Sequence, residues 1–150
     1  VTIAGPNDRR TVAVENFHIP PSEDYMRETV LEPAEIVTEI VLPPPADGLR
    51  SSYRKVRARR TWDFALAGVA LAIVFSGDQA VDCRVVLSGA APVPWRSAEA
   101  EKIVKEGQLD RNRAAKAAAA ALKAAEPMAQ NEYKIPLFRG LIEQQLMAIG

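Results

Sequence analysis

The strongest constraint on the fold of this chain is a pair of apolar stretches that lie close together in the sequence. Gly68–Phe75 and Val81–Leu87 are separated by Ser76-Gly77-Asp78-Gln79, whose residue types favour a tight turn, so this segment is predicted to form a β-hairpin. The first stretch is apolar throughout, which indicates a central strand. The second alternates between apolar and polar residues, which indicates a strand with one buried face. The residues expected on that buried face are Val81, Cys83, Val85 and Leu87.

Two segments before this hairpin are also predicted to be extended. Glu35–Leu42 is rich in β-branched residues and is followed by three consecutive prolines, which is typical of a strand that ends there. Arg50–Arg57 would place Tyr53 and Lys55 on one face of an extended chain. The residues before Glu35 contain turn signals and a proline-rich, acidic stretch that is typical of a surface linker.

The second half of the chain favours helices. Ser97 can begin a helix that ends at Gly107, because a serine oxygen accepts a hydrogen bond from an early backbone N–H. Arg111–Ala125 is rich in alanine, and Pro136–Ile149 has a proline in its first turn, so both are predicted to be helical. Strands followed by helices indicate an α+β fold class, with an antiparallel sheet of about four strands followed by three helices packed on one face.

Composition argues against several classes of protein. The chain has 19 Lys+Arg and 19 Asp+Glu in 150 residues, and a net charge of zero is not typical of a globally basic nucleic-acid binder. Its longest apolar run, Phe64–Phe75, is much shorter than the roughly 20 residues that a membrane-spanning helix needs. The single cysteine, Cys83, and the single histidine, His18, argue against an internal disulfide and against a metal centre. We therefore predict no metal-ligating residues.

The charges are distributed unevenly along the chain. Residues 1–49 are acidic, whereas residues 50–60, here called the cationic stretch, contain no acid. One interpretation of this stretch is a solvated strand edge, and another is a surface that binds an acidic partner or an anion such as phosphate or a nucleotide. Its six cationic residues are Arg50, Arg54, Lys55, Arg57, Arg59 and Arg60.

The sequence contains no pattern typical of a catalytic centre. It has neither a glycine-rich phosphate loop nor a Ser–His–Asp set, so we predict that no residue of this chain is catalytic. Cys83 alternates with Val81 and Val85, which is typical of a small buried side chain rather than a reactive thiol. Trp95 is interpreted as a packing anchor.

From about Glu32 to the C-terminus, seven short motifs follow one another. They are Glu35-Ile-Val-Thr-Glu-Ile-Val-Leu-Pro43, Tyr53-Arg-Lys55-Val-Arg-Ala-Arg59-Arg60, Val69-Ala70, Asp82-Cys-Arg-Val-Val-Leu87, Gly89-Ala-Ala-Pro-Val-Pro94-Trp-Arg96, Ala98-Glu-Ala-Glu101 and Asn131-Glu-Tyr-Lys134. In this order they resemble the C-terminal domain of the FAD-binding subunit of molybdenum hydroxylases, the family of xanthine dehydrogenase, carbon monoxide dehydrogenase and aldehyde oxidoreductase. Gly5–Phe17 is similar to the last strands of the FAD-binding domain that precedes it in that family. The resemblance therefore divides the chain into residues 1–31, the tail of that domain plus a linker, and residues 32–150, the flavoprotein C-terminal domain.

The resemblance also implies cofactor-binding residues. Lys55 matches the lysine that lies close to the flavin in the family, and Val37 matches an aliphatic residue that contacts its ring system. Arg59 and Arg60 match two cationic positions near the flavin. We expect Val37 and Lys55 on the same side of one sheet. Trp62 stands where some relatives have an acid, and the sequence assigns it no role.

The function implied by the resemblance is electron relay. The chain would be the C-terminal part of an FAD-binding subunit that passes electrons from iron–sulfur clusters to an external acceptor, with most FAD contacts made by an upstream segment. The implied partners are a molybdopterin-binding large subunit and a small subunit with 2Fe-2S clusters, in the cytoplasm or in an exported, periplasmic complex. The fragment by itself would be inactive. The alternative is a non-catalytic assembly module whose basic strand binds an acidic partner or an anionic ligand.

Overall fold

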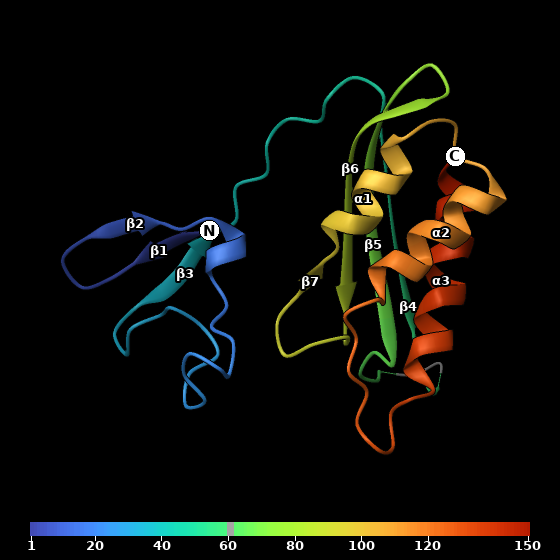
Figure 1. Cartoon of the computed structure of the whole chain (residues 1–150). Helices are drawn as coiled ribbons and strands as arrows, with labels where there is room; N and C mark the ends of the chain where they lie inside the picture. Colours follow the sequence, from blue (N-terminus) through green and yellow to red (C-terminus); the bar gives the residue numbers. More distant parts are fainter. Residues whose placement is uncertain (60–61) are drawn as a thin grey trace. The chain divides into compact units, whose positions relative to one another are not determined.

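The computed structural model describes residues 1–59 and 62–150, which form two compact units, Val1–Pro45 and Ala46–Gly150 (Figure 1). The sequence placed a boundary after residue 31, whereas the two units divide between Pro45 and Ala46. The difference arises because the strand predicted within Glu35–Leu42 pairs with the N-terminal strand of the chain. No helix among the described residues has the length and apolarity needed to cross a membrane.

The first unit is a small antiparallel sheet with the strand order β2-β1-β3. Its strands are β1 (Thr2–Ala4), β2 (Arg9–Thr11) and β3 (Ile36–Glu39), and a short 3-10 helix, Val14–Asn16, follows β2. Ile3 of β1 is fully buried and lies opposite Val37 of β3. The expectation that β3 joins the sheet that carries Lys55 is therefore wrong, because β1 supplies its hydrogen-bonding partner.

An ion pair holds the long loop of this first unit. Arg10 Nε and Nη2 each donate to one carboxylate oxygen of Glu35 at 2.8 Å, and Nη2 also donates to Val30 O at 2.8 Å. Glu35 in turn accepts from the backbone N of Glu32. These hydrogen bonds lower the pKa of Glu35 to about 2, and the bond from Arg10 has the largest effect.

The second unit contains a four-stranded antiparallel sheet with the order β4-β5-β6-β7. The strands are β4 (Leu49–Val56), β5 (Ala67–Ser76), β6 (Gln79–Ser88) and β7 (Trp95–Arg96). The predicted hairpin is confirmed: β5 pairs with β6 across a turn in which Gly77 has a φ of 61°. β5 lies between β4 and β6, as its wholly apolar sequence predicts.

A β-bulge changes the predicted pattern of β6. Val74 lies opposite Asp82 but Phe75 lies opposite Ala80, so Val81 is an extra residue without a partner in the ladder. Val81 is consequently 54% exposed, and Ala80 takes the buried position instead. The prediction that Val81 belongs to the buried face is wrong, whereas Cys83, Val85 and Leu87 are buried as expected.

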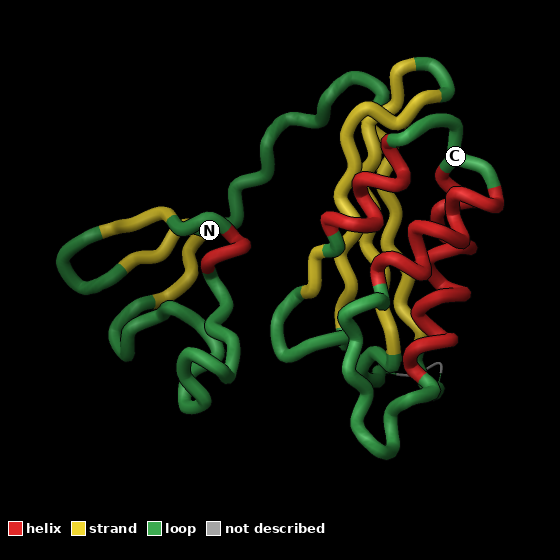
Figure 2. Tube along the Cα trace, in the orientation of Figure 1, coloured by secondary structure: helices red, strands yellow, loops and turns green. Residues whose placement is uncertain are grey.

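Three helices follow the sheet and pack on one of its faces (Figures 1 and 2). They are α1 (Ala98–Lys105), α2 (Arg111–Ala121) and α3 (Lys134–Ile149). Ser97 begins α1 as predicted, because its Oγ accepts from Ala100 N at 3.2 Å. This arrangement confirms the α+β fold class. The core lies between the sheet and the helices and is formed by apolar side chains including Val69, Leu71, Ile73, Val85, Leu87, Val104, Ala117, Phe138, Ile142 and Leu146.

Candidate functional site

The face of the larger sheet that points away from the helices carries the predicted lysine. Residues directly opposite in an antiparallel ladder share a face, so the register places Tyr53 beside Ala70 and Lys55 beside Gly68. Across β5, Gly68 lies opposite Ser88 of β6. We call this surface the outer sheet face. Within the described ranges no helix packs on it.

A glycine shapes the middle of the outer sheet face. A Cβ atom at Gly68 would lie 3.1 Å from the hydroxyl of Tyr53 and would collide with Oγ of Ser88. With no side chain at Gly68, the Tyr53 hydroxyl reaches to 3.5 Å from Ser88 Oγ. Because Gly68 has no side chain, nothing projects from the sheet surface at this position beside Lys55, and the Tyr53 side chain can lie over the glycine. The sequence analysis did not identify Gly68 and Ser88, although a glycine inside an apolar strand is a signal of close approach.

Lys55 is exposed on this face, whereas the next residue, Val56, turns inward and packs against the core. Among the residues that the structure describes, Lys55 makes no ion pair. A lysine carries a positive charge at neutral pH on a flexible stem, so this ammonium is available to an anionic group that approaches the outer sheet face.

Other members of the cationic stretch have structural partners. Arg50 Nη1 donates to the carbonyl oxygens of Ile149 and Gly150 at 3.1 Å, and its guanidinium lies 4.7 Å from the ring centroid of Phe75. Arg50 therefore holds the carboxyl end of α3. Arg59 Nε lies 3.2 Å from an oxygen of Asp63, and the Arg59 side chain is largely exposed whereas that of Asp63 is 20% exposed. Arg60, the fourth predicted cofactor-binding residue, lies outside the described residues.

Two aromatic residues that follow the cationic stretch are almost fully exposed. Trp62 is 98% and Phe64 is 91% exposed, on either side of Asp63. Aromatic side chains of this size are seldom left in water without a partner, so this segment is a second place where the unit can contact another molecule.

Val37 is 39% exposed on β3 of the first unit. Val37 and Lys55 thus lie in different sheets of different units, and the expectation of a common sheet is wrong. Its predicted contact with a flavin stays a prediction.

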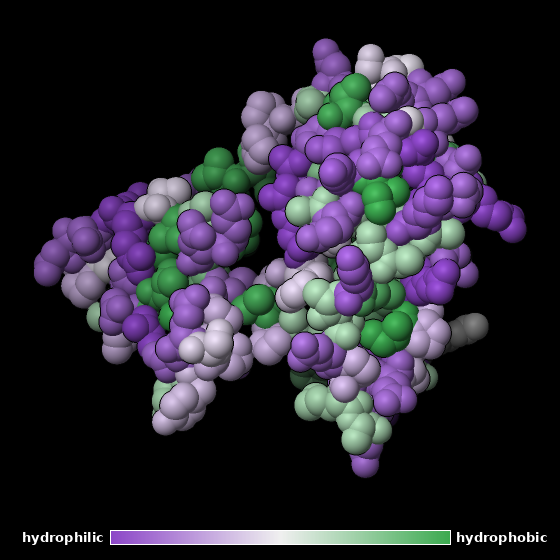
Figure 3. Space-filling view, in the orientation of Figure 1, coloured by the Kyte–Doolittle hydropathy of each residue, from purple (hydrophilic) through white to green (hydrophobic). Residues whose placement is uncertain are grey.

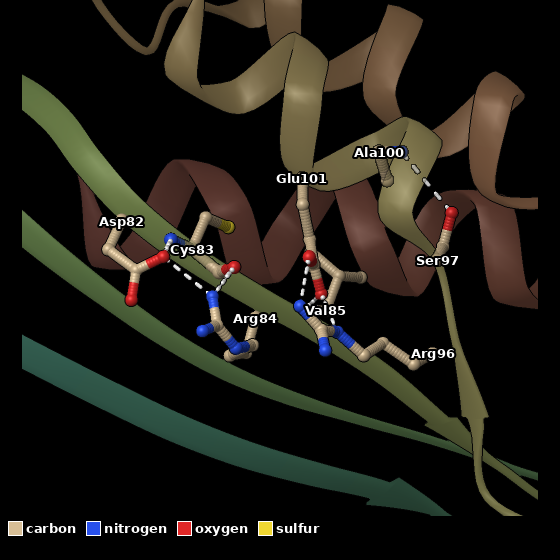
Figure 4. Close-up of polar contacts among 8 residues, drawn as sticks. All are labelled: Asp82, Cys83, Arg84, Val85, Arg96, Ser97, Ala100 and Glu101. Atoms are coloured by element: carbon tan, nitrogen blue, oxygen red, sulfur yellow. Dashed lines mark hydrogen bonds and ion pairs between the residues drawn. The ribbon is translucent and has the colours of Figure 1, made fainter.

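An ion pair between β7 and α1, next to β6, fixes the end of β7 (Figure 4). Glu101 of α1 is 4% exposed and accepts from Arg96 Nε and Nη2, each at 2.8 Å, and from Val85 N at 3.1 Å. Burial opposes ionisation of this carboxylate, but the hydrogen bonds from Arg96 and Val85 outweigh it and keep the pKa of Glu101 below its usual range. The group has its partners within the fold, so we assign it a structural role.

The predicted inertness of Cys83 agrees with its surroundings. Burial, together with the negative charges of Glu101 and Asp82, raises the pKa of its thiol to about 12. A neutral, buried thiol is a poor nucleophile. No group of His, Cys, Asp and Glu residues suited to a metal ion occurs in the described part of the chain.

Comparison with known proteins adds independent findings. Residues 51–149 match the family model described as the CO dehydrogenase flavoprotein C-terminal domain. The aldehyde oxidoreductase FAD-binding subunit of Escherichia coli is 36% identical over 137 residues, which cover 91% of this chain and 39% of the relative. The carbon monoxide dehydrogenase medium chain of Hydrogenophaga pseudoflava is 37% identical over 94 residues, which cover 63% of this chain and 31% of the relative.

The solved structures agree with the sequence relatives. A chain of the Hydrogenophaga pseudoflava carbon monoxide dehydrogenase that lacks the Mo-pyranopterin moiety of its molybdenum cofactor superimposes with a TM-score of 0.85 at 30% identity. The match covers 99% of this chain and 51% of the solved chain. The chain thus spans about half the length of that structure and less of the curated relatives.

Proposed function

Because the chain belongs to the CO dehydrogenase flavoprotein C-terminal domain family, we propose that it forms the C-terminal part of an FAD-binding subunit. In this proposal the complete subunit relays electrons from iron–sulfur clusters to an external acceptor within a molybdenum-containing hydroxylase or dehydrogenase complex. The observation that carries the proposal is the family match over residues 51–149, which includes all of the outer sheet face except the first residues of β4.

The residues on the outer sheet face support a contact with one edge of a flavin. Gly68 has no side chain that would keep a flat ring away from the sheet surface, and the residue Tyr53 is 60% exposed. Lys55 carries a positive charge and has no ion-pair partner among the described residues. Bound FAD would supply the redox chemistry. Lys55 would hold a positive charge beside the ring, and a cation at that place favours negative charge on the flavin. We expect no residue of this chain to act on the organic substrate.

The names of the relatives support the proposed partners. Several are called medium chains, and the first is named an FAD-binding subunit of an aldehyde oxidoreductase. We propose that the complete subunit assembles with a molybdopterin-binding large subunit and a 2Fe-2S small subunit. The 150 residues by themselves would hold little FAD, because the family model that they match is that of the C-terminal domain alone.

The test uses the complete FAD-binding subunit with Lys55→Ala. We expect its flavin to have a lower reduction potential, because a positive charge beside the ring is lost, and a slower rate of reduction. Lys116→Ala is the matched control, since Lys116 is an exposed lysine on α2, on the helix side of the sheet. Flavin content, potential and reduction rate that are unchanged in Lys55→Ala would refute the role of Lys55. In parallel, Val37→Asp tests the predicted contact on β3 by flavin content.

A second candidate function is subunit assembly through the cationic stretch. Arg54 and Lys55 are exposed, and neither forms an ion pair within the described ranges, so both can meet an acidic partner. Exposed charges are screened over about 10 Å at 0.1 M salt, so binding of this kind would weaken steeply as ionic strength rises. A flavin-binding role predicts little dependence of flavin content on salt. Titration of the complex with salt therefore separates the two functions.

A further inference from the structure

An apolar hollow of about 200 Å³ lies at the carboxyl end of α2, on the helix side of the sheet. Its walls include Leu87 of β6, Trp95 of β7, Pro92 of the loop between these strands, and Leu122 and Ala125 after α2. We call it the α2-end hollow. In the space-filling view, pale green, moderately hydrophobic residues lie over the loops below α2 (Figure 3). A smaller hollow of about 90 Å³ shares Leu122 and Ala125 and continues towards Phe138.

Trp95 forms one wall of the α2-end hollow and is 40% exposed. The packing role expected for this residue is thus only partly realised, because much of the side chain remains in contact with solvent. The backbone of Trp95 is nevertheless held: Leu87 pairs with it across the ladder, and the next residue, Arg96, is held by Glu101. A wall that is already ordered loses little conformational entropy when a ligand binds.

The rim of the hollow is negative. Glu126 lines it and forms no ion pair within the described part of the chain. The carboxyl end of a helix also carries partial negative charge, and the last turn of α2, all of which is described, has no basic residue, although Lys123 follows its C-cap residue Leu122. Lys134, which lines the smaller hollow, already donates to Gly89 O at 2.9 Å.

We propose that the α2-end hollow receives a bulky apolar side chain of a protein partner, with an arginine or lysine next to it that pairs with Glu126. Size supports this occupant, because an apolar cavity of about 150 Å³ is enough for one benzene ring. Charge supports the basic neighbour, since Glu126 lines the hollow and no basic residue is among the residues that line it. Aromatic and aliphatic anchors in apolar pockets dominate the energy of many protein interfaces. The site lies on the opposite side of the sheet from Lys55, so it stands or falls independently of the proposed flavin contact.

The experiment uses the full chain with Trp62→Phe, so that Trp95 is its only tryptophan. The probe is N-acetyl-phenylalanyl-arginine amide, added while Trp95 fluorescence is recorded. We expect a saturable change with a Kd of about 1–10 mM, since so small a ligand binds weakly. The phenylalanyl-glutamate amide should bind about two- to fivefold more weakly, and Glu126→Gln should remove this preference. A glycyl-arginine amide should cause no saturable change.

A matched pair of variants locates the binding. Ala124→Phe fills the hollow and should abolish the response, because Ala124 lines it and is exposed enough to accept the ring without unfolding. Ala119→Phe places the same ring on an exposed position of α2 outside the hollow and should leave the response intact. No saturable response up to ~20 mM probe would overturn the proposal. Equal binding of the arginine and glutamate probes would also overturn it, in favour of a site for free aromatic ligands. Dimerisation that only Ala124→Phe prevents would overturn it in favour of a second copy as occupant.

Discussion

Replacement of Glu101 by glutamine tests how the second unit is held together. The wild-type carboxylate is 4% exposed and accepts two hydrogen bonds from Arg96 and one from Val85 N. Hydrogen bonds to a charged group contribute about 1.5–3 kcal/mol to stability. A glutamine keeps one acceptor oxygen but turns its NH₂ group towards a guanidinium, where two donors face each other. The loss from breaking a buried ion pair, about 3–5 kcal/mol, is an upper limit here because Arg96 is 46% exposed and water can hydrate it.

We therefore expect Glu101→Gln to lower the free energy of unfolding of the second unit by about 2–3 kcal/mol and its melting temperature by about 9–14 °C. Both tryptophans lie in the second unit, so urea unfolding followed by their fluorescence reports on this unit. A double-mutant cycle with Arg96→Ala should give a coupling energy of about 1–2 kcal/mol, because the two side chains share two hydrogen bonds. A loss of unfolding free energy below about 0.5 kcal/mol in Glu101→Gln would show that the ion pair is no more stable than the two side chains hydrated by water, and would refute the reasoning.

Three further outcomes follow from the same contacts. Folding lowers the pKa of Glu101 from its ordinary value of 4.5, so the contribution of Glu101 to stability is present above pH 4.5 and is lost as the pH falls through the folded-state pKa. Acid unfolding of Glu101→Gln, followed by fluorescence, should therefore depend less on pH in that window than unfolding of the wild type does. Gly68→Ala should cost about 1–3 kcal/mol and separate the Tyr53 hydroxyl from Ser88, whereas Ser88→Ala with Gly68→Ala should recover part of the loss in urea unfolding; no recovery would show that Ser88 is not the obstacle. Cys83 is fully buried with a pKa of about 12, so a thiol reagent should label it only as fast as the second unit opens, and rapid labelling of the native chain would contradict its placement.

The elements that the sequence predicted well are those with local signals. The hairpin is predicted by two apolar stretches on either side of a turn that contains a glycine. The start of α1 is predicted by Ser97, whose Oγ accepts a hydrogen bond from the backbone N of Ala100, three residues later. Alanine content predicted α2, which ends at Ala121 rather than at Ala125 because Leu122 leaves helical geometry. These signals depend on neighbours within a few residues, and such neighbours are visible in a sequence.

Features that depend on distant partners were not predicted. β3 was expected in the same sheet as β4, yet β1 provides its partner in a separate sheet. The bulge at Val81 could not be predicted either, since alternation continues through the sequence and only the ladder shows the extra residue. β7 has two residues, too few for a periodic pattern, and it is a strand because β6 offers it hydrogen bonds.

The candidate site divides in the same way. The alternation of β4 predicted that Tyr53 and Lys55 share a face, and the register agrees. The contribution of Gly68 and Ser88 depends on how β4, β5 and β6 are aligned, which residue types alone do not determine. The structural use of Arg50 likewise depends on α3 ending nearby, at a distance of about one hundred residues along the chain.

The two outermost strands of the larger sheet have a consequence for how the protein behaves at high concentration. At its isoelectric point, about pH 6.8, the chain has no net charge and molecules repel one another little. Growth of the sheet from molecule to molecule would have to start on β4, which carries Arg54 and Lys55, or on β7, which is two residues long. Two cationic strands of separate molecules repel locally even where the whole molecules do not, so we expect light scattering at pH 6.8 to report single molecules rather than fibrous aggregates.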